Sequence, residues 1–224
     1  MLNNIEWLGH ATIKMSNSDK IIYIDPYNIA ETDMDADVIF VTHSHYDHFS
    51  EEDILKIKKE TTKIVITKDL YQKTLELGFG EEDIVTVKPN EEYQIEGIKF
   101  TTIPSYNMNK KFHPKENNWV GYIIEINNVK YYVAGDTDST EENKKVECDV
   151  AFLPVGGTYT MTADEAAELA NIIQPKIAVP IHYGSIVGTE ANAEKFKEHL
   201  DKKIKYLLCL PLEGKVPQKE TDEV

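Results

Sequence analysis

Three histidines and one aspartate stand within six residues of one another, at His43, His45, Asp47 and His48. Imidazole nitrogen and carboxylate oxygen are the ligands that a zinc-like dication accepts. Residues two apart share a face of an extended segment, so His43 and His45 can converge on one ion, and Asp47 and His48 can face a second. The apolar strand predicted at Val38–Val41 ends directly before them, which favours a metal site over three solvent-exposed loop histidines.

Two further candidate ligands follow predicted strands much later in the chain. Asp136 comes after the strand Val129–Ala134 and after Gly135, which permits a close backbone approach, and it could bridge two ions. His182 follows the strand Ala178–Ile181. Taken alone, Asp136 is more often a turn former, and His182 is as often a hydrogen-bonded core histidine as a ligand. The first motif favours the metal-binding interpretation of both.

The elements that must position these residues are short β-branched runs and a few capped helices. Ser50 followed by three acids predicts a helix to about Lys59, Gly78 ends a helix over Lys68–Leu77, and Thr162 to Glu165 matches a capping box for a helix that ends near Pro175. A last helix is expected at Glu190–Leu200. Strands are expected at Ile5–Leu8, Thr12–Met15, Ile21–Ile24, Val38–Val41, Ile64–Ile66, Ile84–Val87, Tyr93–Ile95, Ile98–Ile103, Trp119–Ile126, Val129–Ala134, Val150–Leu153, Ala178–Ile181 and Tyr206–Leu210.

Two β-rich blocks, each with helices, predict a four-layer αββα sandwich of two mixed sheets. A tight hairpin is expected at Asn127-Asn128. We expect one domain over residues 1–213 and a polar, frayed tail over 214–224.

The composition excludes several classes of protein. The formal net charge of −15 disfavours binding to nucleic acid. Every basic residue is lysine, so no arginine is present to bind a phosphate through a bidentate guanidinium contact. No run approaches the roughly 18 apolar residues of a membrane span. Met1–Glu6 lacks a signal-peptide pattern, so a cytoplasmic location is expected. Cys148 and Cys209 are interpreted as buried free thiols.

These motifs together resemble the metallo-β-lactamase superfamily of hydrolases, over nearly the whole chain from Ile5 to Leu210 and in the family's order. The resemblance implies the αββα fold with the site at one edge, and metal ligation by His43, His45, Asp47, His48, Asp136 and His182. It also implies that Asp25, in Ile24-Asp25-Pro26, supports the histidine loop without binding metal.

Two segments, Trp7–Thr12 and Leu153–Thr158, look like the branch that includes ascorbate-6-phosphate lactonase and the phospholipase D acting on N-acyl phosphatidylethanolamine. That branch usually places a metal-binding histidine shortly after a proline, where this chain has Asn107. His113 lies six residues later and either replaces that ligand or is an ordinary loop residue. If it does not bind, a single ion held by the ligands Asp47, His48, Asp136 and His182 becomes the alternative.

The resemblance predicts a metal-dependent hydrolase that acts on an ester-type bond of a small molecule, such as a phosphodiester or a lactone. The cofactor is one or two divalent ions, zinc first, with manganese or iron as alternatives. Asp47 is expected to bind metal and to orient the nucleophile, while His10, Asn107 and Tyr159 are placed on the substrate side. A structural role is the other option for His10, and a packed aromatic is the favoured alternative for Tyr159. A mononuclear iron thiol dioxygenase and a non-catalytic metal-binding protein remain the rival classes, and a homo-oligomer stays open.

Overall fold

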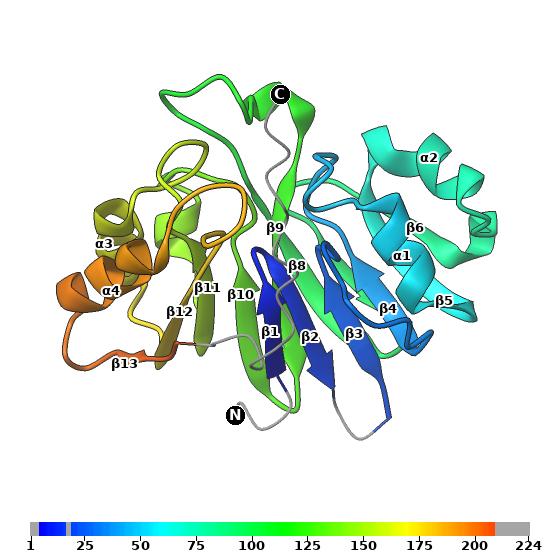
Figure 1. The fold of residues 1–224 in the computed structure, drawn as a ribbon, viewed down its shortest axis with the longest axis horizontal. Coiled ribbons are helices and arrows are strands. Elements are labelled where there is room, and N and C mark those ends of the chain that lie inside the picture. Colours follow the sequence, from blue (N-terminus) through cyan, green and yellow to red (C-terminus); the bar gives the residue numbers. More distant parts are fainter. Residues whose placement is uncertain (1–4, 17–18, 209–224) are drawn as a thin grey trace.

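Two β-sheets with helices on their outer faces make up the computed structural model, which describes residues 5–16 and 19–208 (Figure 1). The strands of the first sheet, in spatial order, are β1 (Ile5–Gly9), β2 (Thr12–Ser16), β3 (Ile21–Ile24), β4 (Ala36–Phe40), β5 (Lys58–Thr67) and β6 (Ile84–Val87). The strands of the second are β13 (Lys205–Tyr206), β12 (Ile177–Ile181), β11 (Val150–Pro154), β10 (Val129–Val133), β9 (Val120–Ile126), β8 (Ile98–Pro104) and β7 (Glu92–Ile95).

Four α-helices and four short 3₁₀ turns connect the strands of the described residues. The α-helices are α1 (Glu51–Ile57), α2 (Tyr71–Glu76), α3 (Ala163–Ile173) and α4 (Glu190–His199), and the 3₁₀ turns are η1 (Lys68–Leu70), η2 (Glu81–Asp83), η3 (Lys115–Asn117) and η4 (Asn143–Lys145). Each sheet has an antiparallel part and a parallel part: β3 to β6 are parallel in the first, and β10 to β13 in the second. The loops that follow parallel strands leave the sheets at a common edge, which is where ligands gather in such folds.

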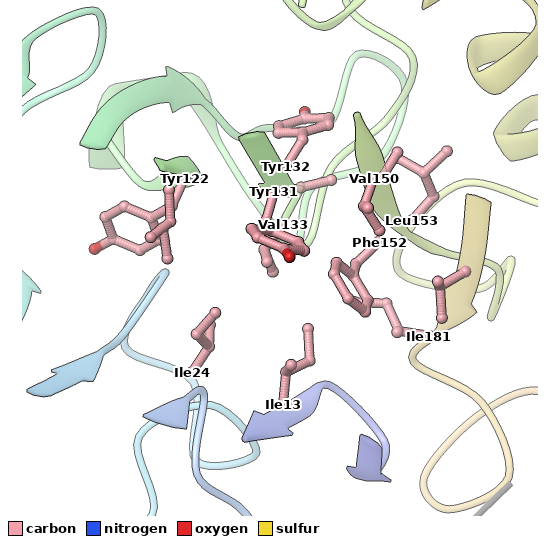
Figure 2. Close-up of a cluster of buried hydrophobic side chains, with 14 of the residues drawn as sticks. Ile13, Ile24, Tyr122, Tyr131, Tyr132, Val133, Val150, Phe152, Leu153 and Ile181 are labelled. Atoms are coloured by element: carbon pink, nitrogen blue, oxygen red, sulfur yellow. The ribbon is translucent and has the colours of Figure 1, made fainter. Parts of the chain in front are cut away.

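The hydrophobic core lies between the two sheets. Figure 2 shows Ile13 and Ile24 of the first sheet pointing toward Tyr122, Val133 and Phe152 of the second, all of them buried. The same core continues between the second sheet and the helices α3 and α4. A second cluster joins the outer face of the first sheet to α1 and to the segment around α2. These layers confirm the predicted αββα sandwich.

Two local sequence patterns, a hairpin turn and a helix cap, correctly predicted the structure at their positions. Asn127 and Asn128 form the two-residue turn between β9 and β10, both with positive φ, as a type I′ hairpin requires. The capping box at the start of α3 is present, with the Thr162 hydroxyl accepting from the Glu165 N–H and the Glu165 carboxylate accepting from the Thr162 N–H. Both features follow from side chains acting on their own backbone.

The prediction was wrong around β5. The helix expected to reach Lys59 ends at Ile57, and the chain passes directly into a strand of ten residues in place of the short one expected at Ile64–Ile66. The Thr62 hydroxyl donates to the carbonyl of Ala36 and accepts from the Lys59 N–H, which ties this polar start of the strand to β4. Pairing with a neighbouring strand therefore overrides the helical pattern.

Smaller differences concern the ends of elements. The helix expected over Lys68–Leu77 is divided into η1 and α2, and the final strand is only two residues long, while Cys209 and Leu210 lie outside the described residues. Cys148 is a free thiol, but only partly buried. The single domain over residues 1–213 stays a prediction, and the tail over 214–224 lies outside the described residues. None of the helices in the described part of the chain has the length and hydropathy to cross a membrane.

Candidate metal centre

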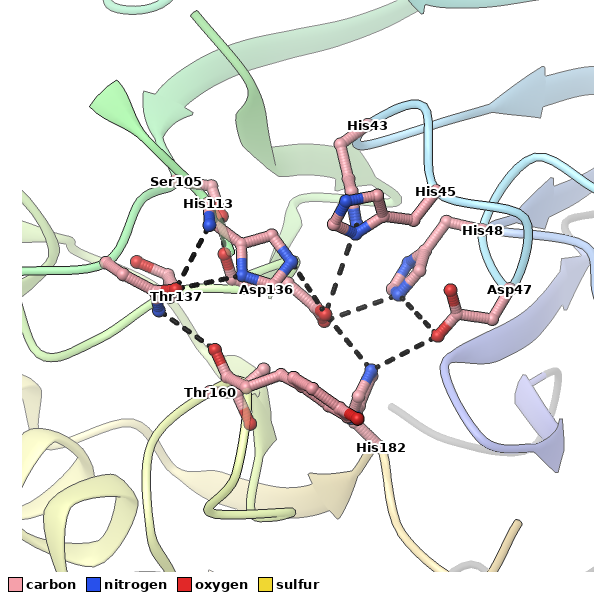
Figure 3. Close-up of polar contacts among 12 residues, drawn as sticks. His43, His45, Asp47, His48, Ser105, His113, Asp136, Thr137, Thr160 and His182 are labelled. Atoms are coloured by element: carbon pink, nitrogen blue, oxygen red, sulfur yellow. Dashed lines mark hydrogen bonds and ion pairs between the residues drawn. The ribbon is translucent and has the colours of Figure 1, made fainter. Parts of the chain in front are cut away.

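The loop that follows β4 carries the histidine motif in a tight turn. The N–H groups of His48 and Phe49 both donate to the carbonyl of His45, at 3.0 and 2.8 Å, so the chain reverses directly after the first two histidines. This turn brings His43, His45, Asp47 and His48 to the same side of the sheet edge (Figure 3). His43 and His48 are buried, while His45 is partly exposed and opens the site to solvent.

Two groups of potential ligands meet at this edge. In the first group, His43 Nε2 lies 3.0 Å from His45 Nδ1, and His113 Nε2 lies 3.1 Å from Asp136 Oδ2. The ligand atoms of these four residues all lie within 4.8 Å of one another. His113, from the loop between β8 and β9, is thus brought to the His43 and His45 pair, the arrangement that the sequence left open.

The second group contains His10, Asp47, His48 and His182, whose ligand atoms also lie within 4.8 Å of one another. His48 Nε2 and His182 Nε2 are each 3.6 Å from Asp47 Oδ2, and His10 Nε2 is 2.8 Å from the same oxygen. The sequence had put His10 in a structural or substrate-side role, and the structure places its ring against Asp47. No spacing rule pointed to it, because it comes from the turn between β1 and β2.

Asp136 lies between the two groups. Its Oδ1 is 3.3 Å from His48 Nε2, and its Oδ2 is 3.1 Å from both His182 Nε2 and His113 Nε2 (Figure 3). One carboxylate therefore reaches ligand atoms of both groups, as expected for a residue that could bridge two ions.

The residues fit a divalent metal because several buried polar atoms have no hydrogen-bond partner. These atoms are His48 Nε2, His113 Nε2, His182 Nε2 and Asp136 Oδ1, because the 3.1 to 3.3 Å contacts of the three nitrogens with Asp136 do not have hydrogen-bond geometry. An unsatisfied buried donor or acceptor costs about 1–3 kcal/mol, so a group of them pointing inward requires an explanation. A cation at their meeting point would supply the missing partner for each of them.

Supporting hydrogen bonds orient these rings. Asp25 Oδ2 accepts from the Thr42 hydroxyl at 2.8 Å and lies 2.7 Å from His48 Nδ1, while its Oδ1 accepts from the Thr42 N–H at 2.8 Å. With Nδ1 engaged in this way, His48 Nε2 points into the site. The structure thus brings Asp25 to the place that the resemblance implied.

Three residues around the centre have left-handed backbone conformations that are uncommon for anything but glycine. His10, Asp25 and His182 have φ values of 49°, 47° and 59°. The His182 N–H donates to the carbonyl of His10 at 2.7 Å, and the indole of Trp7 donates to the same carbonyl, so hydrogen bonds stabilise the conformations of His10 and His182. Backbone strain of this kind concentrates at functional sites.

Electrostatics keep His43, His45 and Asp136 in the protonation states that metal binding needs. Burial lowers the pKa of His43 well below its usual range and also lowers that of His45, so both rings are neutral at pH 7 with lone pairs available. Burial alone would raise the pKa of Asp136, but the facing His182 and His48 hold it well below its usual value. Asp47 is likewise kept ionised, since the contacts from His10 and His182 outweigh its burial.

Two other predicted residues lie beside the centre. Asn107 is buried and hydrogen-bonds His113, and the ring of Tyr159 is half-buried against Phe112, with centroids 4.8 Å apart. Sequence reasoning missed Trp119, whose ring centroid lies 4.9 Å from that of His43 and 4.8 Å from that of His45. Trp119 directly precedes β9, and without the fold this position gives no sign that the residue lies beside the histidines.

An αββα sandwich with a histidine- and aspartate-rich centre at the ends of its strands defines the metallo-β-lactamase class of proteins. A family model described as the β-lactamase superfamily domain matches residues 4–182, and the chain belongs to this superfamily. It is a metal-dependent hydrolase, as its curated relatives are named.

Two archaeal relatives and two solved structures show the extent of the similarity. Proteins named UPF0173 metal-dependent hydrolase from Thermococcus onnurineus and Methanopyrus kandleri are 31% and 29% identical, over 92% and 88% of this chain and 96% and 91% of theirs. A crystal structure of a candidate metal-dependent hydrolase from Parabacteroides distasonis has a TM-score of 0.77 at 29% identity, with 91% of both chains covered. The metallo hydrolase Igni18 from Ignicoccus hospitalis has a TM-score of 0.75 at 21% identity, over 92% of this chain and 94% of that chain.

Proposed function

We propose that the protein hydrolyses an ester-type bond of a small substrate with two divalent ions, zinc in the first instance, in the cytoplasm. His43, His45 and His113 would hold one ion, and Asp47, His48 and His182 the other, with Asp136 between them. The observation that carries the proposal is the convergence of two groups of four histidine and aspartate side chains on one edge of the sheets, where four of their buried polar atoms have no hydrogen-bond partner.

Such a pair of ions, when bound, would lower the pKa of water to about 7 and would stabilise the charge that develops on the oxygens of the scissile bond. The protein's own residues position the reactants. Asp47 is the least buried carboxylate of the centre, at 7% exposure, and its Oδ2 faces His10, His48 and His182. We assign Asp47 the role of metal ligand and orienter of the nucleophile.

His10 is proposed to hold Asp47 in this position. Burial and the nearby His182 lower the pKa of His10 to about 4, so the ring is neutral at pH 7 and its Nε2–H can donate to Asp47 Oδ2. A neutral donor fixes the direction of the carboxylate without cancelling its charge. We therefore propose the structural role for His10, one of the two options left open in the sequence analysis.

The surroundings favour a substrate with an apolar portion beside its ester. Tyr46, between His45 and Asp47, is 63% exposed, and Phe112, next to His113, is 40% exposed. Tyr159 packs against Phe112 on the same side, which keeps it as a proposed substrate contact. Lys110, in the same loop as Phe112, is already paired with Asp138, and the chain contains no arginine. A lactone or a lipid-like phosphodiester, the substrates of the branch resembled in sequence, fits these surroundings better than a multiply charged phosphate does.

Metal-resolved turnover tests the proposal. The protein is stripped with chelator, reloaded with zinc, manganese or iron, and assayed against lactones, phosphodiesters, phosphomonoesters and thioesters. We expect hydrolysis of an ester with zinc or manganese, about two ions per chain, and a loss of at least 10²-fold in kcat for Asp47→Ala with its fold retained. Asp33→Ala, an exposed aspartate paired with Lys14, is the matched control and should keep full turnover.

Two results would contradict the proposal. Activity only with iron and a thiol substrate would move the assignment to the dioxygenase class. An Asp47→Ala protein with full metal content and the turnover of the parent enzyme would remove Asp47 from the mechanism.

A further inference from the structure

The loop between β8 and β9 is closed on itself by Asn107 and His113. The Asn107 N–H donates to the carbonyl of His113 at 2.8 Å, and the His113 N–H donates back to Asn107 Oδ1 at 3.1 Å. Asn107 Oδ1 also lies 3.1 Å from His113 Nδ1. Both side chains are buried, at 8% and 1% exposure, so these three contacts are shielded from water. One carboxamide thus fixes both the backbone and the ring of His113.

The orientation of the Asn107 amide is determined by its other partners. Asn107 Nδ2 lies 3.2 Å from Asp138 Oδ1 and 2.9 Å from the carbonyl oxygen of Tyr159. Both of these atoms only accept hydrogen bonds, so the NH₂ group must face them and Oδ1 must face His113. His113 therefore donates from Nδ1, which leaves the lone pair on Nε2 directed toward Asp136 Oδ2, 3.1 Å away.

Asp138 holds Asn107 in turn. Besides Asn107 Nδ2, the Asp138 carboxylate accepts from the Met108 N–H at 2.8 Å and from the ammonium group of Lys110. The Asp138 N–H donates to the carbonyl of Tyr106 at 2.9 Å. Asp138 follows Asp136 by two residues, so one short segment after β10 supplies a carboxylate to the centre and another to the loop that faces it.

We propose that Asn107 and Asp138 are positioning residues that make His113 the third histidine of the His43 and His45 site, an inference that rests on the proposed two-ion function. Asn107 stands where the branch resembled in sequence carries a ligand histidine, and here it supports a ligand six residues further on. The consequence is selective. Disturbing this pair lowers the metal affinity of the site that contains His113, and it leaves the affinity of the site at Asp47, His48 and His182 unchanged.

Zinc titration of the metal-free protein against a chromophoric chelator tests this selectivity, with cobalt(II) spectra as a second readout. The parent protein should bind two ions. Asn107→Leu should weaken one of them by about 10–100-fold, the range typical when the partner of a ligating histidine is removed. His113→Ala should weaken the same ion and remove the same cobalt(II) band. Asn109→Leu, at an exposed position of the same loop, is the matched control and should leave both ions as they were.

The double variant Asn107→Leu/His113→Ala separates positioning from general damage to the fold. If Asn107 acts only through His113, the double variant binds zinc no more weakly than His113→Ala alone. A further loss in the double variant, or two ions at parental affinity in Asn107→Leu, would overturn the inference. If circular dichroism shows that Asn107→Leu does not fold, Asp138→Asn replaces it, and the zinc affinity of the same site should fall about fivefold. An unchanged affinity in Asp138→Asn would refute the positioning role of Asn107 and Asp138.

The inference rests on the two-ion centre of the proposed function, and its failure can be distinguished from a failure of the hydrolytic activity. A protein that binds two ions and binds one of them more weakly in Asn107→Leu, yet hydrolyses no ester, would retain the inference and refute the hydrolytic function. If His113→Ala binds zinc as tightly as the parent protein does, the inference is refuted, even where the parent protein hydrolyses an ester.

Discussion

Replacing Asp25 removes the acceptor on which the histidine loop depends. Asp25 is fully buried, and its carboxylate receives the Thr42 N–H, the Thr42 hydroxyl and the Nδ1 side of His48 within 2.7 to 2.8 Å. In Asp25→Ala these donors face a small apolar side chain inside the protein. Because Thr42 precedes the histidine loop of the candidate metal centre and His48 belongs to it, the effect should reach both the fold and the site.

The magnitude follows from the number of donors. Each buried donor without an acceptor costs about 1–3 kcal/mol, and alanine at the φ of 47° adds roughly 1 kcal/mol. Relief of the buried charge and entry of water offset part of this sum, so we expect a loss of about 4 kcal/mol in the free energy of unfolding. Asp25→Asn tolerates the same φ and keeps one acceptor oxygen, so its loss should be about 1–2 kcal/mol.

Urea unfolding of the metal-free protein, followed by circular dichroism, measures these differences without any contribution from bound metal. Asp83→Ala, which removes a surface ion pair with Lys63, is the matched control and should change the free energy of unfolding by less than about 1 kcal/mol. If Asp25→Ala were no less stable than this control, the hydrogen bonds to Thr42 and His48 would not be holding the loop.

Three further outcomes are expected. Zinc at about 100 times its dissociation constant should raise the free energy of unfolding by about 2.7 kcal/mol for each site that it fills. In calorimetry this corresponds to a rise in Tm of roughly 5–10 °C per site, and an unchanged Tm would count against specific binding. Burial raises the pKa of the Cys148 thiol to about 12, so its alkylation at pH 8, followed by peptide mass spectrometry, should be ~10³-fold slower in the folded than in the unfolded protein, and equal rates would contradict this. In Gly121→Ala the new Cβ would meet the carbonyl oxygens of Ala134 and Val133 at 2.6 and 2.7 Å, so a loss of about 1–3 kcal/mol is expected in urea unfolding, and parental stability would show that the strands can separate.

Local sequence signals predicted much of the fold. The hairpin at Asn127-Asn128 and the cap at Thr162 depend on residues that are neighbours in the chain, so composition and spacing were sufficient for both. The length of β5 was missed because its polar first half becomes a strand only through contacts with β4, including the bond from Thr62 to Ala36. Strand length is decided by the partner strand, which no short window of sequence contains.

The residues of the candidate metal centre likewise fall into those that the sequence predicted and those that only the tertiary structure placed there. By itself, the sequence determined the candidate group from His43 to His48, and this motif and the family resemblance then made Asp136 and His182, each after an apolar strand, candidate ligands. Only the tertiary structure decided where His113 and His10 lie, since both come from loops whose paths depend on distant partners. The ring of His10 is held by Asp47, 37 residues away, and the ring of His113 by Asn107, which is itself held by Asp138 and the carbonyl of Tyr159. The free energy of such contacts depends on packing that spacing along the chain does not encode.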